Sequence, residues 1–239
     1  MKVILYIALG LVLLCGGALL WRAKTSASRQ PTTADIQRAK YEGIVRKKFR
    51  KDIERAKAEG KDEIVLPPAE GCPSTVNSIE MIMRDYSLLR VKVIDKETTV
   101  PDPDADINTW YKFKVIETLQ QQDKISDAPL LDGVPSRLLP LLPSECILIV
   151  SGGEITVDGV RVIRVIGDYG VDYIRGNEYL IASKLEYGGK VILPIAQAAG
   201  VFRIENTSLK PLGNRWKKLV REVEERYGND LDNLRSGVH

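Results

Sequence analysis

The most constraining feature of the chain is an uncharged, apolar run from Val3 to Trp21, VILYIALGLVLLCGGALLW. A helix of these nineteen residues would be about 28 Å long, close to the thickness of a bilayer's hydrocarbon core. Trp21 precedes Arg22 and Lys24, a pattern typical of a helix end at headgroup level. We therefore predict a membrane-spanning helix in residues 1–24. Its membrane-spanning residues include Val3, Gly10, Cys15 and Trp21.

Two other interpretations of this run stay open. Lys2, together with the small residues at 16–18, fits a signal peptide that is cleaved. A lipoprotein signal ending at Cys15 requires a small residue before the cysteine, whereas Leu14 is bulky. The apolar run also continues to Trp21, further than a signal peptide needs. This length favours an uncleaved anchor.

Charge is distributed unevenly along the chain. Residues 1–61 carry 14 Lys or Arg and 5 Asp or Glu, a balance of +9. Residues 62–239 carry 21 and 27, a balance of −6. A basic segment next to an apolar anchor suits a lipid headgroup surface or an acidic protein partner. The acidic balance of the remainder argues against nucleic acid as a partner.

Residues 25–73 are predicted to form a linker and a basic juxtamembrane helix. The helix runs from Thr33 to Gly60, with Thr33 or Asp35 as its cap. One interpretation of its basic cluster is contact with anionic lipid or with a partner subunit. The other is a solvated face that only spaces the domain from the membrane. The residues of the cluster are Arg46, Lys47, Lys48, Arg50 and Lys51.

Residues 74–213 show the alternation and turn chemistry of a small β domain. A short helix, capped by Ser74 or Thr75, precedes about seven strands. Asp158-Gly159 lies between two β-rich runs and predicts a type I′ hairpin. Residues 61–73 are expected to be irregular, and 214–239 to form a helix packed on the strands through Leu219 and Val223. The predicted fold is mainly β with flanking helices, containing a small antiparallel β-barrel.

Three stretches carry a resemblance to a known domain. They are SIEMIMRDYSLLRVKVIDKET, TWYKFKVIETL and GDYGVDYIRGNEYLIAS, the last with a G-x-x-Y-L step from Gly176 to Leu180. The segment from about Ser74 to Gly213 resembles the netrin-like, tissue-inhibitor-of-metalloproteinases-like domain of many secreted bacterial proteins. The resemblance implies a five-stranded barrel of the oligomer-binding type with a C-terminal helix, usually outside the cytoplasm.

The chain departs from that family in its cysteines. The metalloproteinase inhibitors chelate zinc through a cysteine at the mature N-terminus, whereas Cys72 is internal. The dense disulfide pattern is also missing, so protease inhibition is not implied. Cys72 and Cys146 can form one disulfide in an oxidising compartment. The alternative is two unrelated buried thiols.

The side of the membrane is contested. Five Lys or Arg follow the apolar run within twenty residues, and the positive-inside rule then places the domain in the cytoplasm. The family resemblance argues for an extracytoplasmic domain, which we favour slightly.

Known catalytic and ligand-binding patterns are missing from the sequence. The single histidine is His239, which argues against His-based catalysis or metal binding. No phosphate-binding glycine loop occurs. We therefore assign no catalytic, cofactor-binding or metal-binding residue. We expect a non-enzymatic, single-pass membrane protein that binds or scaffolds protein partners, as an accessory subunit of a respiratory or photosynthetic complex does. The alternative is a secreted, signal-cleaved inhibitor or ligand-binding module.

Overall fold

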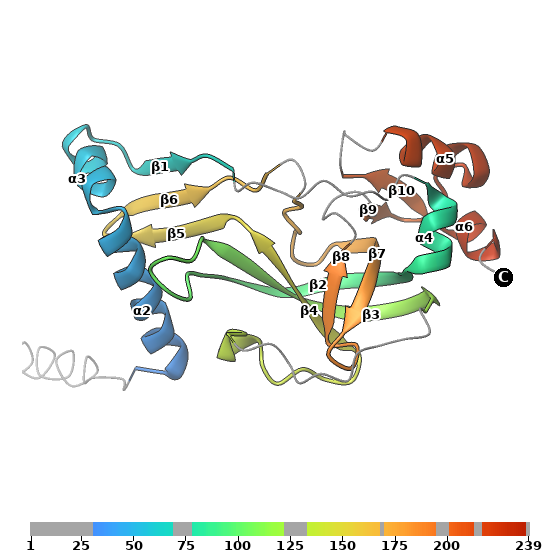
Figure 1. Ribbon diagram of the computed structural model, residues 1–239, viewed down its shortest axis with the longest axis horizontal. Helices are drawn as coiled ribbons and strands as arrows, with labels where there is room; N and C mark the ends of the chain where they lie inside the picture. Colours follow the sequence, from blue (N-terminus) through green and yellow to red (C-terminus); the bar gives the residue numbers. More distant parts are fainter. Residues whose placement is uncertain are drawn as a thin grey trace, which may run out of the picture. The chain divides into compact units, whose positions relative to one another are not determined.

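The computed structural model describes residues 31–68, 78–121, 133–167, 170–194, 201–212 and 217–237. Among them are ten strands in two sheets, together with flanking helices, which confirms the mainly β prediction (Figure 1). The strands are β1 (Glu63–Leu66), β2 (Ser87–Thr99), β3 (Asn108–Gln120), β4 (Glu145–Ser151), β5 (Gly153–Val157), β6 (Val160–Arg164), β7 (Glu178–Glu186), β8 (Val191–Pro194), β9 (Val201–Glu205) and β10 (Ser208–Pro211). The helices are α2 (Thr33–Lys48), α3 (Arg50–Ala58), α4 (Ile79–Asp85), η1 (Ser136–Leu138), α5 (Lys217–Tyr227) and α6 (Leu231–Gly237).

The larger sheet has the strand order β10-β9-β7-β2-β3-β4-β8. β8 pairs in parallel with β4 through Val191 and Ile147, and antiparallel with β7. The hydrogen-bonded path β7-β2-β3-β4-β8 therefore returns to β7. Alternate residues of these strands bury their side chains in one shared core, as the period of two in the sequence predicts.

Aromatic rings occupy the middle of this core. The ring of Tyr173 lies 5.1 Å from Tyr111, 5.2 Å from Phe113 and 5.0 Å from Tyr179, each in an edge-to-face arrangement. The Tyr111 hydroxyl donates to Asp172 at 2.8 Å, so its polar end is satisfied. Trp110, on the opposite face of β3, is buried as well. These aromatic residues therefore serve packing.

The smaller sheet has the order β1-β6-β5. Its β5–β6 hairpin turns at Asp158 (φ 52°) and Gly159 (φ 82°), which confirms the predicted hairpin. The expectation that residues 61–73 are irregular is wrong for Glu63–Leu66, which pair in parallel with β6. Four residues give too short a pattern to predict such a strand when its partner lies about a hundred residues away.

The larger sheet passes into the smaller one between β4 and β5. Gly152 (φ 118°) and Gly153 (φ 137°) form this crossing, and the backbone there is one that only glycine adopts readily. A Cβ on Gly153 would collide with Thr109 Oγ1 and lie 2.9 Å from Thr98 Cγ2. The crossing thus brings the smaller sheet against the ends of β2 and β3.

Three helices cover the outer face of β2 and β7. α4 is capped by Ser78, whose hydroxyl accepts from Met81 N at 3.3 Å; the predicted caps Ser74 and Thr75 lie outside the described residues. α5 buries Leu219 and Val223 as predicted, and it ends before Gly228 (φ 64°). These helices share a core with Leu88, Leu180 and Ala182 of the sheet.

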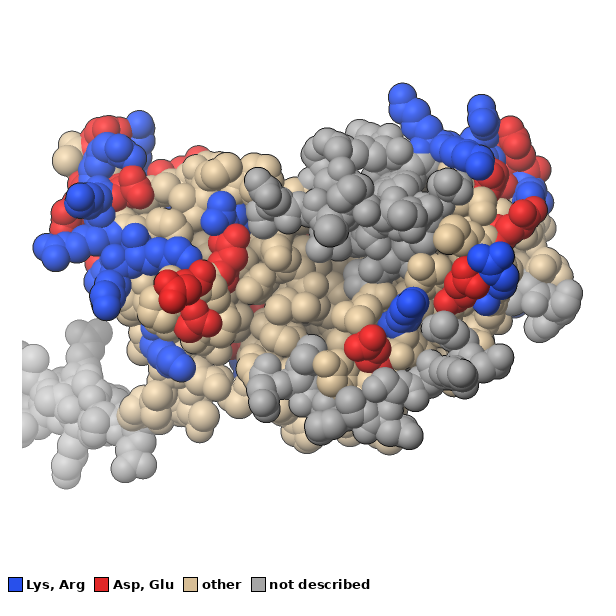
Figure 2. All heavy atoms as spheres, in the orientation of Figure 1, with Lys and Arg blue, Asp and Glu red and all other residues tan. Residues whose placement is uncertain are grey.

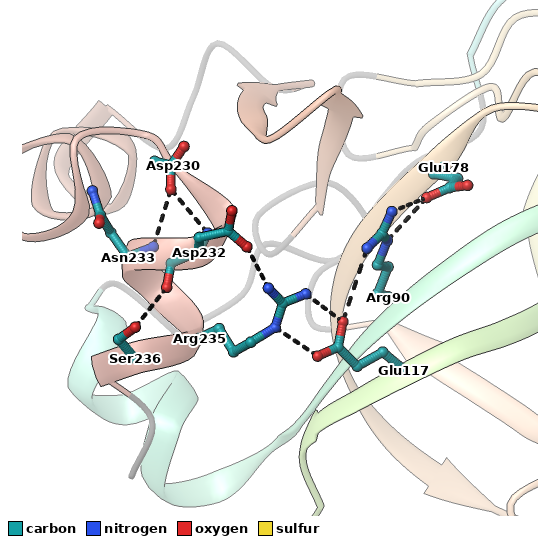
Figure 3. A network of polar contacts seen from close by, with 8 residues as sticks. All are labelled: Arg90, Glu117, Glu178, Asp230, Asp232, Asn233, Arg235 and Ser236. Carbon is teal, nitrogen blue, oxygen red and sulfur yellow. Dashed lines mark hydrogen bonds and ion pairs between the residues drawn. The ribbon is translucent and has the colours of Figure 1, made fainter.

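A network of ion pairs attaches α6 to the strands. Figure 3 shows Arg235 donating to both oxygens of Glu117 on β3, each at 2.7 Å, and also contacting Asp232. Glu117 lies 4.0 Å from Arg90 on β2, which in turn pairs with Glu178 on β7 at 2.7 Å. In this network each arginine lies between two carboxylates. The network thus connects α6 with the strands β3, β2 and β7.

The predicted membrane span lies outside the described residues, as do Val3, Gly10, Cys15 and Trp21. No helix among the described residues is long and apolar enough to cross a membrane. The described part of the chain from Gln37 onward belongs to one compact unit. The helix predicted within residues 25–73 therefore packs with the strands from Gln37 onward, because it shares a core with β5 and β6.

We expect two glycine substitutions to act in opposite directions. Gly159→Ala forces a Cβ into a left-handed turn and should destabilise the protein by about 1 kcal/mol. Gly43→Ala places a methyl group on α2, where nothing lies within 4 Å, and should stabilise by up to about 1 kcal/mol. Urea unfolding followed by circular dichroism measures both. Equal midpoints for the two variants would contradict the assigned conformations.

Candidate functional site

The candidate site is the basic face of α2 and α3. α2 starts with a reciprocal cap, in which Asp35 N donates to Thr32 Oγ1 at 3.2 Å and Thr32 N donates to Asp35 at 2.8 Å. The predicted single helix is interrupted at Phe49 (φ −109°, ψ 24°), where α3 begins. Nine Lys or Arg and four Asp or Glu lie in residues 33–58, a balance of +5.

Apolar side chains hold the two helices on the smaller sheet. Val45 of α2 and Ile53 of α3 are almost fully buried against Val157 and Val162. Burying each such side chain contributes about 1.5–3 kcal/mol. Ile36, in the first turn of α2, is exposed. α2 is therefore held mainly by its second half, which contains the buried Tyr41 and Val45.

An ion pair fixes the position of α2 over the hairpin turn. Arg46 donates from Nε and Nη2 to the two oxygens of Asp158, at 3.0 and 2.7 Å. Lys57 of α3 lies 3.6 Å from the same carboxylate. The Arg46 hydrogen bond holds the pKa of Asp158 below its usual range. Both partners are exposed, so the pair contributes only modestly to stability.

A shallow groove of about 430 Å³ lies between the two helices and the turn. Figure 2 shows blue side chains gathered over this end of the unit. The groove is lined by Gly43, Arg46, Lys47, Arg50, Ile53, Glu54, Lys57 and Asp158.

The five predicted basic residues divide into two groups. Arg46 pairs with Asp158, Arg50 pairs with Glu54 at 2.8 Å, and Lys48 donates to Ala105 O at 2.7 Å. Within the described ranges, Lys47 and Lys51 form no hydrogen bond or ion pair. Three residues of the cluster therefore have partners within the protein, and two lysines remain available to a ligand.

The structure describes only one of the two cysteines of the predicted disulfide. Cys146 is a free thiol buried in the core of the larger sheet, and Cys72 lies outside the described residues. Burial raises the pKa of Cys146 to about 12, so the thiol is unreactive at neutral pH. A disulfide would require Cys72 to reach this interior, and the pairing stays a prediction.

The structure brings together residues that the sequence did not single out. Asp158 was interpreted only as a turn residue, yet it is the counter-ion of the helix pair. Lys112 and Glu145 form a largely buried ion pair at 2.8 Å beneath residues 139–143. Both pairs join residues that are far apart in sequence, so no local pattern indicates them. Among the described residues, no group of three or more His, Cys, Asp or Glu can hold a metal ion.

The chain matches no known protein family, and no curated protein is significantly similar to it.

We expect Asp158→Asn to loosen α2 and α3 in a pH-dependent way. The hydrogen bond from Arg46 lowers the pKa of Asp158 in the folded protein, so the ion pair stabilises the fold above about pH 4, the pKa of Asp in the unfolded chain. This stabilisation is lost as the pH falls through the lower pKa that Asp158 has in the folded protein. The variant should therefore unfold at lower urea than the native chain at pH 7, and the difference should disappear at acid pH.

Glu54→Gln is the matched control for this prediction. It removes a carboxylate that pairs only within α3, and should leave the contact with the hairpin intact. A difference for Asp158→Asn that persists at acid pH would contradict the assigned ion pair.

Proposed function

We propose that this protein is a non-enzymatic scaffolding protein, anchored by its apolar leader and presenting a basic surface to an acidic protein partner. A single-span accessory subunit of a larger membrane complex fits this description. The observation that carries the proposal is the position of Lys47 and Lys51 on helices that share a buried core with a sheet. Charges held in place are suited to steering and orienting a partner.

The charge distribution supports a protein partner. Arg46 and Lys57 share the single carboxylate of Asp158, which leaves an excess of positive charge beside Lys47. The groove also contains Ile53 and Gly43, so an acidic segment could contact apolar surface there as well as lysines. Mixed apolar and charged contacts are typical of specific interfaces between proteins.

The larger sheet supports the scaffolding role. We propose that the path β7-β2-β3-β4-β8 is a small barrel of the oligomer-binding, netrin-like type. Its support is the return of β8 to β7 and the single aromatic core inside. Such a barrel, packed with side chains, offers a rigid platform.

The first test reverses the charge of the two available lysines. We expect Lys47→Glu with Lys51→Glu to weaken partner binding about tenfold at low salt and less at high salt. Affinity purification from native membranes, with quantitative mass spectrometry of co-eluting chains, measures this. Lys210→Glu with Lys217→Glu makes the same charge change at exposed residues of β10 and α5. Equal loss in both double variants would contradict a specific surface.

The second test concerns the anchor. We expect the full chain to resist alkaline extraction from membranes and to keep an intact mass that begins at Met1 or Lys2. Leu11→Arg, in the middle of the apolar run, should release it, since Arg costs about 2.5–3.5 kcal/mol at a helix centre. Ser26→Arg, in the linker, is the control. A mature chain that begins at or after Leu19 would select the secreted alternative.

A further inference from the structure

The segment between η1 and β4 exposes two leucine side chains. Leu139 is 37% exposed and Leu142 is 58% exposed, and each is followed in the chain by another apolar residue. In Figure 1 this segment is the yellow-green trace that leads into β4. We call residues Leu139 to Pro143 the leucine loop.

The carbonyl groups of the leucine loop are bonded by two lysines of the domain. Lys112 Nζ donates to Pro140 O at 3.2 Å. Lys190 Nζ donates to Leu142 O at 2.7 Å and to Pro143 O at 3.1 Å. The polar side of the loop therefore faces the domain. Leu139 and Leu142 face outward, whereas Leu141 packs against the core around Trp110 and Ile147.

At four of its five positions, the loop has no unbonded backbone N–H group. Leu139 N donates to Ser136 O at 3.1 Å, and Leu142 N donates to Glu145 at 2.9 Å. Pro140 and Pro143 carry no N–H. An unbonded backbone group in lipid costs several kcal/mol. A loop with most of its backbone already bonded avoids much of this cost.

Glu145 binds the loop through its carboxylate, which accepts a hydrogen bond from Leu142 N. Burial raises the pKa of Glu145, but the Leu142 amide and the Lys112 ammonium together lower it further than burial raises it. The group is therefore a carboxylate at neutral pH. Its charge balances that of Lys112, and Lys190 adds a positive charge at the base of the loop.

The helix η1, which directly precedes the loop, contacts the end of α2 that leads to the apolar run. Ser136 Oγ, in η1, donates to Gln37 Oε1 at 2.9 Å. Eleven residues separate Trp21 from Thr33, and they span at most about 40 Å when extended. The anchor therefore allows this end of the unit to reach the bilayer surface. Lys47 lies ten residues beyond Gln37, about 15 Å further along the helix.

We propose that the leucine loop inserts Leu139 and Leu142 into the headgroup–acyl boundary of the bilayer. This inference rests on the membrane anchoring proposed above, and it deepens that proposal by naming a second contact with lipid. Two leucines expose too little area for a stable interface with a protein. Next to a covalent anchor, however, weak insertion is sufficient because the local concentration of lipid is high. The insertion orients the unit and leaves Lys47 and Lys51 free for a protein partner.

Photochemical cross-linking of the full chain tests this inference. The chain is reconstituted in vesicles of phosphatidylcholine and phosphatidylglycerol, with a benzophenone amino acid at Leu142. Val65 has the same exposed fraction, 58%, and is the matched control position. We expect lipid adducts, detected by mass spectrometry, to be at least about tenfold more frequent at 142 than at 65. A benzophenone at Leu139 provides a second position in case the first variant folds poorly.

The outcomes separate the two proposals. Vesicle flotation of the chain with lipid adducts at 142 or 139 supports insertion. Flotation with adducts only to protein, within the chain or to a second copy, overturns the loop proposal but leaves the anchor. Equal lipid adducts at 142 and 65 also overturn it. Failure of the unmodified chain to float would contradict both the anchor and the loop.

Discussion

The close approach at Gly153 is the constraint on which the arrangement of the two sheets depends. β4 leaves the larger sheet and continues as β5 of the smaller one, and Gly152 and Gly153 make this crossing with positive φ angles. Gly152 N donates to Ile107 O at 2.8 Å, and Thr109 Oγ1 donates to Gly152 O at 2.7 Å. A side chain at 153 would push the smaller sheet away from β3. The helices α2 and α3 would move with it, because their core is shared with β5 and β6.

This constraint links the two surfaces discussed above, the basic helices and the leucine loop. The smaller sheet carries the basic helices, and the larger sheet carries the leucine loop through Lys112, Glu145 and Lys190. A rigid crossing keeps the distance between these surfaces fixed. The anchored scaffold that we propose requires that property, because a partner at Lys47 would be oriented relative to the membrane only if the intervening parts keep their positions.

The sequence predicted those features that depend on neighbouring residues. The alternation in β2 and β3, the Asp158-Gly159 hairpin and the Leu219–Val223 stripe of α5 are all local patterns, and all appear in the structure. The parallel pairing of β1 with β6 and the Arg46–Asp158 ion pair join residues about a hundred positions apart. No local pattern encodes such contacts, so the basic cluster was identified but its division into two groups was not. The polar support of the leucine loop was missed for the same reason.

Hydrogen exchange of the full chain in lipid nanodiscs tests most directly that the basic helices form one unit with the strands. If α2 and α3 are packed as described, amides from Tyr41 to Lys57 exchange as slowly as those of β5 and β6. Faster exchange in these helices, at rates expected for a free helix while both sheets remain protected, would contradict the account. The basic surface would then be a mobile arm, and its lysines could not orient a partner.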